Sequence, residues 1–264
     1  MPRPAPLIHD ERTLRGVHPS FSIADSAAMP LAFEYPRMAV PDVNLDDTHR
    51  RSLRLAAVGA LIFSLLFVVH HLLQGTGPAS SSTAEVAAYN VTHRGTLLAS
   101  EVALGFGLLA FIAFLAPLAV VIWRTGQETT AVAVLVAGTV FLSMGLMSTA
   151  AETALVGVAD SNEPGAVDAL NQLQGRTPVV WAVTALATAI SLAILRAGLL
   201  RRWLGVSGLV LAGVFLLASI STLLGRGVEG GYSLIGVGLF IVWMLALSVG
   251  LWRKATARAS PGPG

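Results

Sequence analysis

Hydrophobic residues make up 54% of the 264-residue chain and charged residues only 12%, whereas soluble domains carry roughly a quarter charged residues. This composition argues against an ordinary water-soluble fold. The net charge of +2 does not indicate a nucleic-acid partner, because the basic residues cluster at the ends of apolar runs, as membrane anchors do. The chain has no cysteine, which excludes disulfides, thiolate metal sites and cysteine nucleophiles.

The chain begins with a polar segment, residues 1–48, that is rich in proline and shows no sustained hydrophobic period. This composition predicts a disordered cytoplasmic tail. The first apolar run follows it, too late for a secretory signal peptide, and is therefore expected to be a retained helix. We expect residues 49–255 to form the transmembrane domain and residues 256–264 a short cytoplasmic C-terminal tail.

Six apolar runs are each long enough to cross a bilayer core about 30 Å thick as a helix. They cover approximately Ser52–Leu73, Thr96–Trp123, Thr130–Val158, Val179–Leu200, Trp203–Leu224 and Tyr232–Trp252. Isolated strands cannot span a membrane, and the alternating pattern of a closed barrel is absent. The predicted fold class is an all-α membrane protein, a bundle of six transmembrane helices.

The basic residues beside the spans predict the orientation, because short cytoplasmic loops accumulate positive charge. One side of the membrane receives Arg50, Arg51, Arg54, Arg124, Arg196, Arg201, Arg202, Arg253, Lys254 and Arg258, and the other only Arg94, Arg176 and Arg226. Both termini are therefore expected in the cytoplasm, N-in and C-in. Tryptophans at predicted span ends, where they settle at headgroup level, are Trp123, Trp181, Trp203 and Trp252.

The two longer loops are both expected outside. One contains Ser82 and Glu85 in a capping-box pattern that predicts a short helix towards Tyr89. The other has Pro164 in a first-turn position, followed by apolar residues at helical spacing, namely Val167, Leu170 and Leu173. This pattern predicts a surface helix, and together the two helices would cover the outer mouth of the bundle.

Glycines within the spans are expected to let neighbouring helices approach closely, which we favour over a hinge role. They are Gly105, Gly107, Gly138, Gly145, Gly236 and Gly238.

Polar residues within spans are costly in hydrocarbon, so they are the natural candidates for function. The candidate polar cluster consists of Glu101, Glu152, His70, His71 and His93, at similar depth on the outer side of three consecutive spans. The alternative for the histidines is a place in the headgroup layer, or for His93 simply in a loop. The alternative for each glutamate is a satisfied contact between helices.

Spacing limits any metal site in this cluster. His93 and Glu101 share a helix face but lie roughly 12 Å apart along it, and the adjacent His70 and His71 point about 100° apart. A metal would need one of that adjacent pair together with Glu101 or Glu152 from neighbouring helices. The sequence contains no catalytic constellation, so it leaves open whether the chain is an enzyme, and it identifies no cofactor or metal.

The basic turn and following Trp-Leu-Gly within Arg196–Leu209, together with His93–Gly95, Trp243 and Leu251–Arg253, resemble a group of bacterial, largely actinobacterial, membrane proteins. That group is an uncharacterised domain of unknown function. The resemblance covers residues 50–255, implies a six-helix bundle and supplies no site residue. Lys254 is the only lysine among 17 basic side chains, which is typical of a high-GC bacterial genome, so we expect the bacterial plasma membrane.

Three functions remain open from the sequence. The chain is an accessory or scaffold protein, or a proton-, cation- or small-solute-linked carrier or sensor that uses the Glu/His cluster, or a haem or metal-binding membrane protein. The expected partner is the lipid bilayer, without nucleic acid. A homo-oligomer or another membrane protein as partner is left open.

Overall fold

A computed structural model of the protein describes residues 45–75, 77, 82–161, 163–176, 179–223 and 231–257. Its eight described helices are α1 (Leu45–Gln74), α2 (Thr83–Thr92), α3 (Arg94–Trp123), α4 (Glu128–Val158), α5 (Pro164–Arg176), α6 (Val179–Ala197), α7 (Arg202–Leu223) and α8 (Gly231–Thr256). Most of the expected N-terminal tail and most of the C-terminal tail lie outside the described residues. The first helix begins at Leu45, a few residues inside the segment expected to be the tail.

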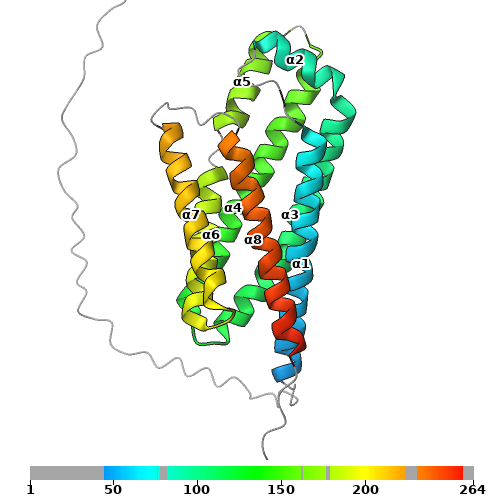
Figure 1. Cartoon of the computed structure of the whole chain (residues 1–264). Helices are drawn as coiled ribbons and strands as arrows, with labels where there is room; N and C mark the ends of the chain where they lie inside the picture. The colour runs from blue at the N-terminus through cyan, green and yellow to red at the C-terminus, as the bar shows by residue number, and fades with distance from the viewer. Residues whose placement is uncertain are drawn as a thin grey trace, which may run out of the picture. The chain divides into compact units, whose positions relative to one another are not determined.

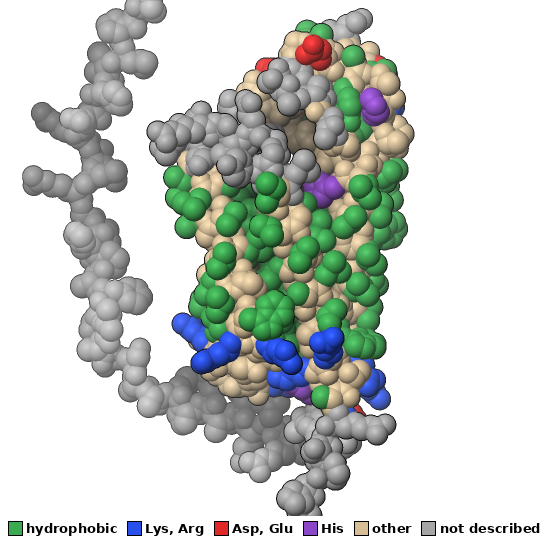
Figure 2. All heavy atoms as spheres, viewed as in Figure 1, with side chains coloured by type: hydrophobic (Ala, Val, Ile, Leu, Met, Phe, Trp, Pro, Cys, Tyr) green, Lys and Arg blue, Asp and Glu red, His purple; other side chains and the backbone are tan. Residues whose placement is uncertain are grey.

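Six of these helices, α1, α3, α4, α6, α7 and α8, are long and apolar enough to cross a membrane, as the sequence predicted. The shortest, α6, has 19 residues and is about 28 Å long at 1.5 Å per residue. Large apolar side chains such as Phe106, Val210 and Leu217 are more than half exposed on the outside of the bundle. Lys and Arg side chains gather at one end of this apolar surface (Figure 2). The surface therefore matches a lipid bilayer better than water.

The six spans form a ring in chain order, because α1 packs on α3, α3 on α4, α4 on α6, α6 on α7, α7 on α8, and α8 on α1 (Figure 1). Phenylalanine rings fill the centre of the ring. Phe63 of α1 contacts Phe111, Phe141 and Phe240, with ring centroids 5.1–6.3 Å apart. Phe67, one turn further along α1, contacts Phe240 at 6.2 Å. This central aromatic cluster closes the middle of the bundle.

Two side-chain hydrogen bonds hold α8 to its neighbours. Ser248 Oγ donates to the Ala57 carbonyl of α1 at 2.8 Å, and Trp243 Nε1 donates to the Leu204 carbonyl of α7 at 3.0 Å. Both donors are buried, so each bond satisfies a polar atom that would be costly to leave unpaired in a low-dielectric interior.

The expected close packing at glycines is confirmed at three positions. A Cβ at Gly138 would overlap Leu115, one at Gly145 would lie 3.1 Å from Leu108, and one at Gly236 would lie 3.0 Å from Phe215. Gly107 makes only ordinary contacts. The prediction is wrong for Gly105 and Gly238, because nothing lies within 4 Å of a Cβ built there.

The two short helices predicted in the longer loops are confirmed, and both lie at the end of the bundle (Figure 1) opposite the basic side chains (Figure 2). α2 begins with the expected capping box: Ser82 Oγ accepts from the Glu85 N–H, and the Glu85 side chain accepts from the Ser82 N–H. Val86 of α2 and Val167 of α5 pack with Leu155 of α4. We call α2 and α5 together the cap.

Candidate functional site

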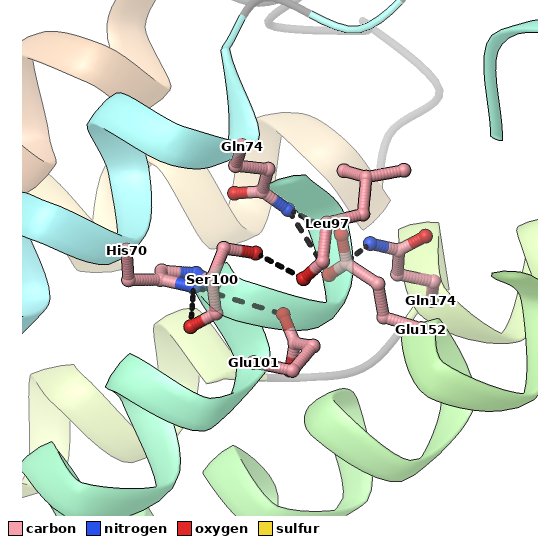
Figure 3. Close-up of polar contacts among 7 residues, drawn as sticks. All are labelled: His70, Gln74, Leu97, Ser100, Glu101, Glu152 and Gln174. Atoms are coloured by element: carbon pink, nitrogen blue, oxygen red, sulfur yellow. Dashed lines mark hydrogen bonds and ion pairs between the residues drawn. The ribbon is translucent and has the colours of Figure 1, made fainter. Parts of the chain in front are cut away.

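A buried polar group lies directly beneath the cap, one to two helical turns into the spans. Glu101 of α3, Glu152 of α4 and His70 of α1 are all buried, with 5–6% of their surface exposed. The ring that brings α1, α3 and α4 side by side therefore gathers three of the five predicted site residues (Figure 3). We call these three residues the buried triad.

Within the triad, the side chains of His70 and Glu101 lie close together. His70 Nδ1 lies 3.6 Å from Glu101 Oε1 and 3.1 Å from the carbonyl oxygen of Ser100. The second distance permits a hydrogen bond in which the ring nitrogen donates to the carbonyl, so Nδ1 would carry a proton. The first is too long for a strong hydrogen bond.

Glu101 is the least satisfied member of the triad. Neither of its carboxylate oxygens has a hydrogen-bond partner among the described residues. Thr149 lies near enough to affect Glu101, and its Oγ1 likewise has no hydrogen-bond partner there. No described arginine or lysine forms an ion pair with it. Glu101 and Glu152 are close enough to interact electrostatically. A buried carboxylate without donors, beside a second carboxylate, is an unstable charge arrangement unless a proton or a cation joins it.

Glu152 has the opposite environment, because its carboxylate accepts hydrogen bonds from two glutamine side chains. Gln74 Nε2, at the end of α1, donates to both oxygens at 2.9 and 3.0 Å. Gln174 Nε2 of α5 donates to Oε2 at 2.9 Å. Tyr89 of α2 donates from its hydroxyl to the Gln74 carbonyl at 2.9 Å. Glu152 therefore joins the spans to the cap (Figure 3).

A cavity of about 170 Å³ lies between Glu152 and the cap. Its polar side chains are Gln74, Tyr89, Asn90, Glu152, Asn171 and Gln174. The volume is enough for several water molecules at about 30 Å³ each. The cavity is a polar entrance on the cap side, and we call it the outer chamber.

The central aromatic cluster lies on the other side of the triad. Phe67 packs against both histidines of α1, with ring centroids 6.1 Å from His70 and 4.6 Å from His71. The triad is therefore bordered by the polar outer chamber towards the cap and by phenylalanine rings towards the basic end.

The remaining two predicted site residues occupy different surroundings. His71 is half-buried beside the triad, and its Nε2 has no hydrogen-bond partner among the described residues. His93 is exposed at the junction of α2 and α3, where its ring stacks on Tyr89 at 4.2 Å and Nδ1 lies 3.0 Å from the Tyr89 carbonyl. The structure therefore places His93 outside the buried group.

No group of three or more His, Asp or Glu side chains within the described ranges is arranged to hold a metal ion. Apart from the rings of His70 and His71, the possible ligands are oxygen atoms: two carboxylates, a threonine hydroxyl and the amide carbonyl groups of the glutamines. Hard ions and protons suit such donors better than soft transition metals do.

The sequence did not reveal the role of the two glutamines. Gln74 lies four residues after His70, which places both on one face of α1. Gln174 lies seven residues after Val167, which is close to two helical turns, so the face that packs on the bundle continues to it. Helical spacing could therefore have identified both glutamines, Gln74 from the position of His70 and Gln174 from the position of Val167.

Comparison with known proteins found no match among protein-family models, curated proteins or solved structures.

Proposed function

We propose that this protein is a proton-linked carrier or sensor of the membrane, with Glu101 as the group that binds the proton. The observation that carries the proposal is the burial of the Glu101 carboxyl group without a hydrogen-bond donor, beside Glu152 and 3.6 Å from His70. Two adjacent buried carboxylates repel one another, which favours a proton on Glu101, the one without donors. Ionisable groups inside membrane bundles commonly form proton relays.

The surroundings of the triad support access from the cap side. The outer chamber offers water a polar path as far as Glu152, whereas phenylalanine rings border the triad on the other side. A sensor needs only this one access. A carrier additionally requires the central aromatic cluster to open, because a charged group does not cross a dry aromatic layer at low cost.

The proposed setting is a bacterial plasma membrane, with both termini in the cytoplasm. We also propose that the chain is a member of the actinobacterial-type group that it resembles. The support is the gathering of Lys and Arg at one end of the bundle (Figure 2). In this orientation the cap and the outer chamber face the outside of the cell, so the site would respond to external protons.

Single cysteines test the orientation, because the natural chain has none. Ala169 of α5 and Thr129 of α4 are exposed at opposite ends of the bundle. In intact cells, a membrane-impermeant thiol reagent is expected to label Ala169→Cys fully and Thr129→Cys only after lysis. Labelling in the reverse pattern would overturn the proposed orientation, and cysteine-free protein provides the background signal.

The Glu101→Gln variant tests the proton site. In detergent or lipid, infrared spectra of the wild type are expected to contain a protonated-carboxyl band that shifts in D2O and is missing in Glu101→Gln. The amide is nearly isosteric, so we expect the free energy of unfolding to change by less than about 1.5 kcal/mol. Glu163→Gln, which removes an exposed carboxyl group, is the matched control and should keep the band.

A band that persists in Glu101→Gln, or is absent from the wild type at every pH tested, would contradict the assignment. Loss of the band on addition of sodium chloride, but not choline chloride, would mean that a sodium ion replaces the proton. Vesicles with an imposed pH gradient then separate the two roles. If the protein is a carrier, the wild type dissipates the gradient faster than the Glu101→Gln variant. If it is a sensor, the two dissipate it at the same rate.

A further inference from the structure

A second cavity, of about 720 Å³, lies at the basic end of the bundle, far from the buried triad. It is a groove between the α6–α7 turn, the start of α7 and the last turns of α8. Three cations line it: Arg201, Arg253 and Lys254. Within the described part of the chain, no acidic side chain forms an ion pair with any of them. The groove therefore has positive charge that no described side chain neutralises.

Beyond the cations, the groove is apolar and continues along α8 away from the basic end. Leu245 and Val249 of α8 line it, and they precede Arg253 at intervals of four residues, so the three share one helix face. At 1.5 Å per residue, this row extends about 12 Å from the cation. Val249 is half exposed, as is Trp203 on the facing side of the groove. The apolar row is therefore accessible from the surface that faces lipid.

Local packing holds the groove in shape. Lys254 Nζ donates to the Leu199 carbonyl at 2.7 Å, which fixes one cation against the α6–α7 turn. At Gly250 an added Cβ would lie 3.2 Å from Leu204 Cδ1 and 3.3 Å from Leu200 Cδ2. The missing side chain keeps α8 close to that turn, so the apolar row and the cations border a single groove.

We propose that this groove binds one anionic phospholipid from the leaflet at the basic end, with its headgroup phosphate at Arg201 and Arg253 and an acyl chain along Leu245 and Val249. The uncompensated cations complement an anionic headgroup, and guanidinium groups bind phosphate oxygens in a forked geometry. The apolar row selects a lipid over a free phosphate, because a free phosphate has nothing to place there. Basic pockets between transmembrane helices bind anionic headgroups in this way.

The proposal is tested by titrating purified full-length protein with phosphatidylglycerol or with phosphatidylcholine of the same acyl chains, and counting bound lipids by native mass spectrometry. The wild type is expected to bind phosphatidylglycerol preferentially. The double variant Arg201→Gln/Arg253→Gln should bind it about 30-fold more weakly. The matched control Arg54→Gln/Arg124→Gln removes two exposed cations at the same end but outside the groove, and should change affinity less than about twofold.

Three results would overturn the proposal. Equal binding of the two lipids would show that the headgroup is not recognised. Equal losses in the two double variants would show general attraction to the basic end rather than binding in the groove. Displacement of the lipid by glycerol phosphate at similar concentrations would show an anion site that makes no use of the apolar row. Because none of these variants alters the buried triad, the outcome is independent of the proposed proton site.

Discussion

Replacing Gly59 with alanine is expected to lower the free energy of unfolding by about 3 kcal/mol or more. Gly59 lies where the backbones of α1 and α3 come close together. A Cβ there would lie 2.5 Å from the backbone nitrogen of Phe114 and 2.8 Å from the carbonyl oxygen of Ala110. Backbone atoms cannot rotate away as a side chain can, so the two helices must move apart and lose contacts along their length.

The measurement is the apparent melting temperature and the denaturant midpoint of purified protein in one detergent. Gly105→Ala is the matched control, because it adds the same methyl group within a span where nothing lies within 4 Å. That variant should be neutral or more stable by up to about 1 kcal/mol, since alanine favours helix more than glycine does. Equal stability of the two variants would contradict the proposed backbone contact between α1 and α3.

The sequence predicted the spans but not their neighbours, and Gly59 illustrates the reason. A bilayer crossing requires about twenty apolar residues, and that signal is independent of what each residue touches. In lipid, however, the buried face and the exposed face of a helix are both apolar, so hydrophobic periodicity does not identify the contact face. The sequence signal for the contact face of α1 was a row of small residues at intervals of four, Ala56, Ala60 and Ser64. All three are fully buried, and Gly59 lies beside this row.

The candidate site was predictable to the extent that polar residues are costly in lipid. Glu101, Glu152 and His70 could be selected because they are rare polar groups at similar depth, and the ring of helices places them together. The sequence also predicted a similar depth for His93, yet it is exposed. Position in the sequence does not specify whether a side chain near the end of a span points into the bundle or into solvent. Which partner satisfies each carboxylate depends on contacts across helices, which local sequence does not determine.

Replacing Glu152 with alanine is expected to release α5 from the bundle. The carboxylate accepts hydrogen bonds from Gln74 of α1 and Gln174 of α5, and its removal takes the acceptor from both half-buried amide groups. A hydrogen bond to a carboxylate contributes about 1.5–3 kcal/mol, and α5 loses one such bond, that of Gln174. We expect α5 to lose about 2 kcal/mol of local stability, which corresponds to about 30-fold faster amide hydrogen exchange.

Hydrogen exchange followed by mass spectrometry measures this change peptide by peptide. Amides of α5 should exchange faster in Glu152→Ala, whereas amides at the basic end of α7 and α8 should be unchanged, because no contact of Glu152 reaches them. Glu152→Gln retains one acceptor oxygen and should show an intermediate effect, and Glu163→Ala, an exposed carboxylate just before α5, is the control. If α5 kept its full protection in Glu152→Ala, the apolar contacts of Val86, Leu155 and Val167 would be sufficient to hold the cap, and Glu152 would be free to act on the proton at Glu101 alone.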